Sequence, residues 1–412
     1  MMASRPSPNR LSPSYTARGY SSPRPGVFAG RPRSLLARAF ARNSALRHMD
    51  WLLIVVVAAL SAIGVLLVWS ATQPSLIAAG QDPRTYLKKQ LLWVVIGLIL
   101  MVAISFADTR QLRSWAPIAY GVTLLALLAV LTPVGAEVNG AKAWINLPGG
   151  FQIEPSEFAK VALILIMATV FSRARGNVPG LRAVLLALAV AAPLMALVVI
   201  EPALGVALVL VVTTATLVVL SGARLRIIAG IAAVIAVAVA AAGGLHLLKS
   251  YQLTRFTSFL HPNADLAGAG YNAAQAKIAV GSGGMFGQGL FHGQLIAGNF
   301  VPSQQTDFIF TVAGEELGFV GTITIVVLLG VVIVRALRIA SRADDLFGML
   351  VASGIAIWFA FQSFVNIGMT IGIMPITGLP LPFVSYGGSA VFADMIAIGL
   401  LQSVHRRHRV FD

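Results

Sequence analysis

The sequence predicts an all-α polytopic membrane protein of about ten transmembrane helices, with both termini cytoplasmic and a large extracytoplasmic loop between helices 7 and 8. Three observations lead to this prediction: composition, the length of the apolar runs, and the placement of lysine and arginine. Hydrophobic residues make up 57% of the 412 residues and charged residues only 11%. The mean hydropathy is +0.84. This composition is typical of an integral membrane protein and excludes an ordinary soluble domain.

Apolar runs of about 20 residues, the length that crosses a bilayer, recur along most of the chain. We expect spans at 51–70, 90–107, 115–134, 156–173, 182–200, 202–221, 226–248, 313–335, 346–373 and 389–404. Residues 1–45 are rich in Pro, Ser and Arg, which predicts a disordered basic cytoplasmic tail. Because a long polar stretch precedes the first apolar run, we do not expect the tail to be a cleavable signal peptide. Residues 46–409 then form the transmembrane domain, with the large loop at 249–312.

Most of the 30 lysines and arginines fall on one side of these spans. They occur in the tail and at Arg110, Arg113, Arg173, Arg175, Arg182, Arg224, Arg226, Arg335, Arg338, Arg342, Arg406, Arg407 and Arg409. The positive-inside rule makes that side cytoplasmic and places the loop 249–312 outside. The net charge of +15 is therefore explained by the membrane topology. We also expect the basic residues to contact anionic membrane lipids. Nucleic-acid binding is not expected. The chain has no cysteine, which excludes disulfides and cysteine chemistry.

Most of the 15 acidic residues fall in the predicted outer half of the protein. Acidic groups contribute little to topology, so orientation alone does not require this distribution. Outer carboxylates with a few basic residues suit a polar ligand that is reached from the outer leaflet. Solvation of the outer loops is the simpler alternative, and it accounts for Asp82 and Glu137.

Glu157 and Lys160 stand out because they lie at the outer end of a predicted span. Pro155 suits the first turn of a helix, and the two charged residues are then i,i+3 neighbours on one face. Ionisable groups at membrane depth pair with one another or line a cavity. Both readings stay open here: a structural ion pair and a pair that faces a ligand. Farther along, Glu201-Pro202 predicts either a tight outer turn or a re-entrant segment.

The loop 249–312 is long for a connection between spans, and such loops are functional or disordered. Its many aromatic and aliphatic residues favour an ordered loop. Within it, Thr306 is expected to cap a helix that begins at Asp307. Asp265 lies among closely spaced glycines, and from local sequence it is equally well a turn-capping residue or a functional one. After the ninth span, the charge-free stretch 374–389 contains several prolines and glycines, which exclude a regular helix. We therefore expect a compact outer segment there. Asp394 follows on the last span and needs a partner inside the bundle, which the sequence does not identify.

Four stretches carry a family resemblance. They are Asn139-Gly140-Ala141-Lys142-Ala143-Trp144-Ile145, Glu154-Pro155-Ser156-Glu157-Phe158-Ala159-Lys160, Thr306-Asp307-Phe308-Ile309-Phe310 through Gly314-Glu315-Glu316-Leu317-Gly318, and Pro380–Ser389. In this order on ten predicted spans, they resemble the SEDS family (shape, elongation, division and sporulation), the polytopic peptidoglycan polymerases that include RodA and FtsW. The likeness covers about residues 51–409. Asn366-Ile367-Gly368-Met369 and Gly372-Ile373-Met374-Pro375 look more like the RodA branch, which acts in cell elongation and shape, than the FtsW branch.

The resemblance implies a glycosyltransferase of the bacterial cytoplasmic membrane whose active site faces outside. Its substrate would be lipid II, polymerised into β-1,4-linked glycan with release of undecaprenyl diphosphate. Asp265 matches the family's essential loop aspartate and would be the general base. Glu157 and Lys160 match its functional pair, and Arg255 is a candidate phosphate contact.

Further substrate-binding candidates are Lys142, Trp144, Asp307 and Ser385. The resemblance also implies a class B penicillin-binding protein as transpeptidase partner. A divalent cation, Mg²⁺ or Mn²⁺, is expected for a diphosphate leaving group, although the sequence does not identify its ligands. Three positions depart from the common family pattern: Ala203 replaces a frequent Asp, Leu266 a frequent Pro, and Gln305 a frequent His. These three differences leave the Asp265 carboxylate in place. They put in doubt the conformation of the loop 249–312 and any functional role of position 305.

Two other functions compete with this one. A lipid II flippase would place polar residues near the bilayer midplane on discontinuous helices and would often show repeated halves. This chain instead has its charges at the outer rim and no evident repeat. A non-catalytic membrane scaffold of an elongation or division complex would not need Asp265 or the Glu157–Lys160 pair. Polymerisation of lipid II by the wild type, and its loss in Asp265→Ala, would separate these alternatives.

Overall fold

The computed structural model describes residues 48–138, 141–147, 151–174, 179–224, 226–230, 233 and 269–410. Our predictions for the tail, for Arg255 and Asp265, and for most of the seventh span lie outside these residues. Within them the all-α polytopic fold is confirmed. Eight described helices are long and apolar enough to cross a membrane, and the shorter helix α7 is apolar as well.

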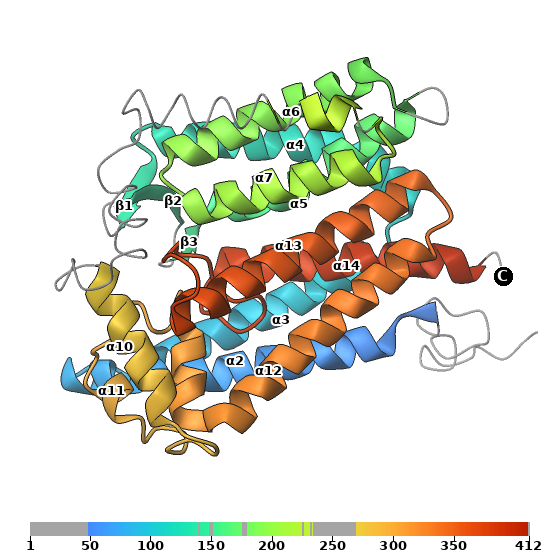
Figure 1. Ribbon diagram of the computed structural model, residues 1–412. Coiled ribbons are helices and arrows are strands. Elements are labelled where there is room, and N and C mark those ends of the chain that lie inside the picture. The colour runs from blue at the N-terminus through green and yellow to red at the C-terminus, as the bar shows by residue number, and fades with distance from the viewer. Residues whose placement is uncertain are drawn as a thin grey trace, which may run out of the picture. The chain divides into compact units, whose positions relative to one another are not determined.

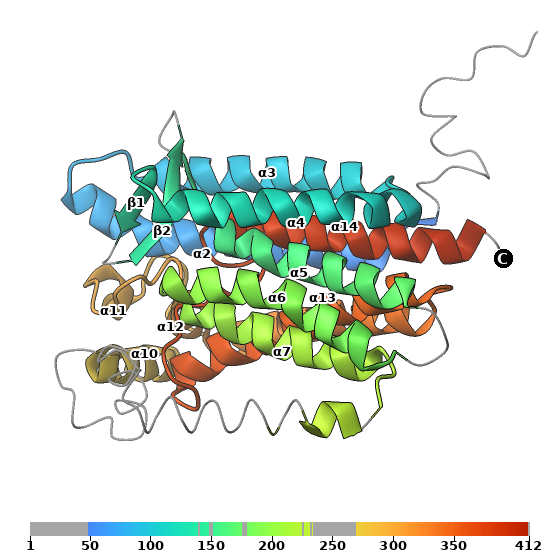
Figure 2. The same ribbon diagram turned by 90° about the horizontal axis from the view of Figure 1, so that it is seen from above.

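The long helices run side by side along one direction (Figures 1 and 2). They are α2 (Trp51–Ala78), α3 (Thr85–Ser105), α4 (Thr109–Leu131), α5 (Pro155–Arg173), α6 (Leu181–Ile200), α7 (Leu204–Leu220), α12 (Ile309–Ser341), α13 (Leu346–Ile371) and α14 (Gly388–Val410). The turn Glu201–Ala203 joins α6 directly to α7. A tight turn is therefore the correct reading of Glu201-Pro202.

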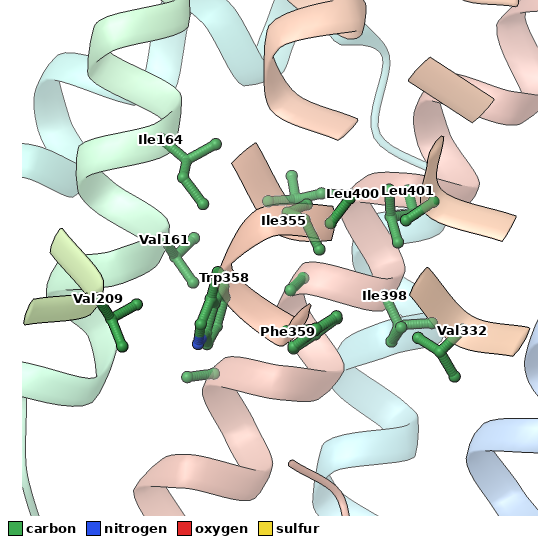
Figure 3. Close-up of a cluster of buried hydrophobic side chains, with 14 of the residues drawn as sticks. Val161, Ile164, Val209, Val332, Ile355, Trp358, Phe359, Ile398, Leu400 and Leu401 are labelled. Atoms are coloured by element: carbon green, nitrogen blue, oxygen red, sulfur yellow. The ribbon is translucent and has the colours of Figure 1, made fainter. Parts of the chain in front are cut away.

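Helix α13 packs against α5, α7, α12 and α14 and forms the centre of the bundle. Figure 3 shows the apolar side chains that fill this centre, including Trp358 and Phe359 of α13. Most of α5, α13 and α14 is buried, whereas most residues of α3, α4 and α6 are half-buried or exposed. Because α5 and α13 are surrounded by protein, polar side chains on them can be kept away from lipid.

The start of α2 and the end of α14 lie at the same end of the bundle. The backbone of Asp50 exchanges two hydrogen bonds with the Gln402 side chain, at 2.8 and 3.0 Å. The Asp50 carboxylate also caps α2 and pairs with Arg335 at 2.6 Å. Arg113 and Arg407 meet at Asp345 at the same end. Three arginines that we predicted on the cytoplasmic side are thus gathered at one end.

The opposite end carries a feature that the sequence did not predict, a small antiparallel sheet (Figure 1). Its strands are β1 (Gly135–Val138), β2 (Ala141–Leu147) and β3 (Phe151–Ile153), in the order β1-β2-β3. Ile145 pairs with both Gly135 and Ile153. Since only one residue separates the end of β3 from the start of α5, the sheet fixes the start of that helix.

The described part of the predicted outer loop begins at residue 269 and contains α10 (Ala269–Ser282) and α11 (Gln294–Ala297). The predicted helix start at Asp307 is wrong. Helix α12 begins at Ile309 without a side-chain cap, and the Thr306 hydroxyl donates to the Ser303 carbonyl at 3.2 Å. Residues 303–308 turn tightly instead, with Thr306 and Phe308 amides both bonded to Ser303.

Candidate functional site

The start of α5, directly after β3, holds the predicted charged pair. Pro155 occupies the first turn of the helix, and the Lys160 ammonium lies 2.8 Å from the Glu157 carboxylate. Both side chains are almost completely buried, with 1% and 3% of their surface exposed. A buried ion pair is costly unless its remaining hydrogen-bonding groups find partners, and α13 supplies these partners.

Gln362 of α13 completes the surroundings of Lys160. Its side-chain oxygen accepts from the Lys160 ammonium at 2.9 Å and from the Trp358 indole N–H at 2.6 Å. The ammonium also lies 4.7 Å from the centre of the Trp358 ring, within range of a cation–π interaction. The Gln362 amino group donates to the Pro380 carbonyl at 2.8 Å. One glutamine therefore links α5, α13 and the segment Pro380–Ser389.

Asn366 lies one turn farther along α13. Its amino group donates to the carbonyls of Asp307, at 2.8 Å, and Leu379, at 2.6 Å. It therefore joins the entrance of α12 to the segment that follows α13. Our sequence reasoning missed the site roles of Gln362 and Asn366. The available signal was two amide side chains at i,i+4 in an apolar span, because such residues face the same way and are rarely left unpaired in a membrane.

The segment Pro380–Ser389 is compact and packed on the bundle, as predicted. The Ser385 hydroxyl donates to the Thr306 carbonyl at 2.6 Å and accepts from the Leu381 amide at 2.7 Å. The Asp394 carboxylate of α14 accepts a hydrogen bond from the Phe383 amide at 3.0 Å. This amide is the partner of Asp394 that the sequence did not identify. Phe383 has a φ of 65°, an uncommon conformation for a non-glycine residue.

Carboxyl groups gather around the start of α5. Glu154 accepts from the Ser156 hydroxyl at 2.8 Å. Its burial, and then the negative charge of Glu157, raise the Glu154 pKa, and Asp307 is close enough to add to the rise. Burial, with the charge of Glu154, raises the pKa of Glu201 to about 8. Both Glu201 oxygens are buried without a hydrogen-bond partner. Lys160 thus lies in a strongly acidic neighbourhood.

The other predicted site residues lie in separate parts of the chain. Lys142 and Trp144 lie on β2, where the Lys142 ammonium donates to the Leu131 carbonyl at 3.3 Å. Ser385 is held inside the Pro380–Ser389 segment, as described above. Asp265 and Arg255 fall outside the described residues, so their distances to Lys160 stay unmeasured. Among the residues that are described, no group of three His, Asp or Glu side chains could hold a metal ion.

Glu315 and Glu316 of α12 are buried and bind the loop before this helix. The Glu315 carboxylate accepts hydrogen bonds from the backbone amides of Leu295 and Ile296, at 2.8 and 3.1 Å. It thus supplies acceptors for two amides in the first turn of α11. Glu316 accepts from the Ser70 hydroxyl of α2 at 2.5 Å. Glu316 also accepts from the Phe291 amide at 3.2 Å. These two carboxylates therefore bind the loop before α12 to α12 itself and, through Ser70, to α2.

Comparison with known proteins agrees with this architecture. The family model FtsW/RodA/SpoVE, described as "Cell cycle protein", matches residues 50–410. A probable peptidoglycan glycosyltransferase FtsW of Trichlorobacter lovleyi is 37% identical over 361 residues, which cover 87% of this chain and 93% of the relative. The peptidoglycan glycosyltransferase MrdB of Escherichia coli K12 is 36% identical over 365 residues, covering 89% and 95%.

A solved structure reported as "Structural coordination of polymerization and crosslinking by a peptidoglycan synthase complex" aligns with a TM-score of 0.72 at 32% identity. The alignment covers 87% of this chain and 98% of that chain. Sequence and fold therefore agree over nearly the whole length of the described bundle.

Proposed function

The chain belongs to the FtsW/RodA/SpoVE family of peptidoglycan glycosyltransferases, and from this premise we propose that it polymerises lipid II at the outer face of the bacterial cytoplasmic membrane. The observation that carries the proposal is the buried Lys160 at the outer end of α5, linked through Gln362 to the Pro380–Ser389 segment. A charged site at the end of an apolar bundle suits a substrate with a polar head and a lipid tail. Ionisable residues inside a membrane protein mark functional sites by default.

The reaction is one displacement. The 4-hydroxyl oxygen of the acceptor sugar attacks the anomeric carbon of the donor as the bond from that carbon to the diphosphate oxygen breaks. Asp265 takes the hydroxyl proton as general base, and the bond's electron pair leaves with undecaprenyl diphosphate. Because the nucleophile enters opposite the leaving group, an α-linked donor gives a β-1,4 product without a covalent sugar–enzyme intermediate.

We assign the other residues to binding and positioning. Arg255 contacts the diphosphate, and Lys142, Trp144 and Asp307 line the path of the sugar substrate. Ser385, whose buried hydroxyl is bonded to Thr306 and Leu381, positions the Pro380–Ser389 segment beside that path. Since the Lys160 ammonium is enclosed by Glu157, Gln362 and Trp358, we assign it a positioning role. It holds Gln362 and adds positive potential near the developing charge, while Glu157 orients it.

A divalent cation stays part of the proposal. Mg²⁺ commonly binds through one or two carboxylates together with phosphate oxygens, so a cation carried by the diphosphate would need few protein ligands, and the described residues hold no group of three His, Asp or Glu side chains for it. Asp307 is the described carboxylate that we assign to it. When bound, the cation would neutralise charge on the leaving diphosphate.

The elongation role and the partner are finer proposals. The FtsW and MrdB relatives are similarly distant, at 37% and 36% identity, so a role in cell elongation and shape rests on the stretch Asn366–Met369 and its neighbour Gly372–Pro375. The likeness to a synthase complex that couples polymerization and crosslinking supports a class B penicillin-binding protein as the transpeptidase partner.

The test compares the wild type with Asp265→Asn in liposomes that contain labelled lipid II and the partner protein. We expect polymer from the wild type and a loss of about 10²–10⁴-fold in the variant, the contribution of a general base. The matched control is Asp82→Asn, which changes an exposed aspartate paired with Lys88 and should leave the rate unchanged. Equal rates in wild type and Asp265→Asn would overturn the assignment. Lipid II translocation without polymer would favour a flippase, and neither activity would favour a scaffold.

A further inference from the structure

One stretch of the predicted outer loop carries no charge. Between Lys277 and Asp307 there is no Asp, Glu, Lys or Arg, and His292 is the one titratable side chain. Loops in water are usually rich in polar and charged residues, whereas segments in contact with lipid avoid charges. The composition of residues 278–306 is therefore unusual for a segment that is wholly outside the membrane.

The loop Gly283–Phe291 is hydrogen-bonded to a break in α12. At Gly318 the backbone leaves helical geometry, with φ 67° and ψ −163°, and groups of α12 on both sides of the break bond to the loop. The four bonds run from Gln288 N to Glu315 O (2.9 Å), Gly289 N to Glu316 O (3.0 Å), Phe319 N to Gly284 O (2.9 Å) and Val320 N to Met285 O (3.1 Å). Non-helical backbone is tolerated at membrane depth only when such partners satisfy it.

Apolar side chains cover the outside of this joint. Met285 is 59% exposed and Phe286 is 82% exposed. They adjoin Phe319 and Val320 at the start of the transmembrane part of α12, which are exposed too. The same helix continues with exposed Ile323, Val326 and Val327. The apolar surface of the loop is thus continuous with the surface that α12 presents to lipid.

The depth of the loop follows from its contacts with α2. The Phe291 ring lies 4.8 Å from the Trp69 ring, and the Phe291 amide donates to the Ser70 hydroxyl at 3.0 Å. At 1.5 Å per residue, Ser70 is about 28 Å along the helix from Trp51. The hydrocarbon core is about 30 Å thick. Since Asp50 and Arg335 form their ion pair at the other end, the loop lies near the outer boundary of the core.

We propose that the loop Gly283–Phe291 lies in the outer leaflet and inserts Met285 and Phe286 among the acyl chains of the bilayer. Apolar rings at the boundary of the core are typical membrane anchors. The anchor holds the broken end of α12, and with it Glu315 and Glu316, at a fixed depth. This inference is independent of the reaction that the protein catalyses.

The absence of cysteine from the chain allows a direct test. Phe286→Cys is made in the full-length protein and reconstituted into liposomes, and a charged, membrane-impermeant maleimide is supplied on both sides. Lys88→Cys, at a side chain that is 69% exposed, is the control that gives the labelling rate of a thiol in water. Val327→Cys, on the exposed face of the α12 span, is the control in lipid.

We expect Phe286→Cys to react at least about tenfold more slowly than Lys88→Cys, because an apolar environment disfavours the reactive thiolate. After SDS denaturation all three variants should react alike. Since Phe286 is largely exposed, its replacement removes little packing, and Met285→Cys serves as the second variant if expression fails. Labelling of Phe286→Cys as fast as Lys88→Cys in intact liposomes would overturn the proposal.

Discussion

Lys160 and Gln362 are far apart in the sequence, yet the ammonium nitrogen of one lies 2.9 Å from the side-chain oxygen of the other, close to the end of the bundle where α5 begins. This bond connects the charged pair on α5 to the helix that carries the Pro380 contact. Because Lys160 and Glu157 are buried together, removing one charge leaves the other without a counter-charge in a place that water does not reach.

The first prediction separates the stability of this pair from its function. Lys160→Met should lower the free energy of unfolding by about 3–5 kcal/mol, since Glu157 then stays buried and unpaired. The double variant Lys160→Met/Glu157→Leu should recover most of that loss, because it removes both charges. Thermal unfolding in detergent measures the stability, and polymerisation of lipid II measures the function. We expect the double variant to be inactive; near wild-type polymerisation by it would mean that the pair is only structural.

The second prediction concerns Asp394, which accepts the Phe383 amide at 3.0 Å. Asp394→Leu should cost about 1–3 kcal/mol, the penalty for an unpaired buried amide. Asp394→Asn keeps an acceptor oxygen at the same place and should cost less. Melting temperatures of the two variants test this. Equal losses would show that the hydrogen bond to Phe383 contributes nothing measurable.

The arrangement of the helices could be predicted because hydropathy and positive charge are local signals. Each described span that the sequence predicted has a helix at its position, although α2 runs on through Pro74 to Ala78. The partners of buried polar groups could not be predicted in the same way, because they come from distant parts of the chain. Gln362 meets Lys160, and Ser70 meets Glu316, only after the bundle has assembled.

The outer loops show a second limit of local reasoning. The strands β1, β2 and β3 are short, and the sheet that they form contacts α4, α5 and α14. Their pairing therefore involves distant parts of the chain, which local sequence does not reveal. The glycine at 318 gives no local sign that α12 breaks there. The break becomes stable because Gly284 and Met285 supply acceptors for the freed amides of Phe319 and Val320.

The third prediction is a dependence of stability on pH. The ordinary pKa of Glu201 is 4.5 and burial raises it to about 8 in the folded protein. Between these values the folded state keeps a proton that the unfolded state releases, so stability falls as pH rises from about 4.5 to about 8 and levels off above. Glu154, whose pKa is also raised, adds a change of the same sign.

The contribution of Glu201 has an upper limit of about 1.4 kcal/mol per pH unit within that window. Melting temperatures of the wild type and of Glu201→Gln, measured from pH 5 to 9 at constant salt, test it. The variant cannot release a proton at this position, so its curve should be flatter than that of the wild type. Parallel curves would contradict the assignment of the raised pKa to Glu201.

The fourth prediction uses two glycines of α12. Gly318 has φ 67°, and a Cβ there would meet the backbone nitrogen of Gly287 and lie 2.7 Å from the carbonyl carbon of Phe286. Gly330, in the same helix, has open space around its Cβ position. Gly318→Ala should destabilise the protein by about 1–3 kcal/mol from backbone strain alone, with a further loss from the clash. Gly330→Ala should instead be neutral or stabilising by up to about 1 kcal/mol, the difference in helix propensity.

Unfolding of the two variants in detergent measures this difference in stability. A spin label at Phe286→Cys, introduced into each variant, measures the mobility of the loop Gly283–Phe291. In Gly318→Ala the label should gain mobility, because the bonds that hold Gly284 and Met285 to α12 require the close approach that alanine prevents. In Gly330→Ala the label should be unchanged. If both variants unfold at the same temperature with the same label mobility, α12 does not need the break at Gly318, and the loop is held by other contacts.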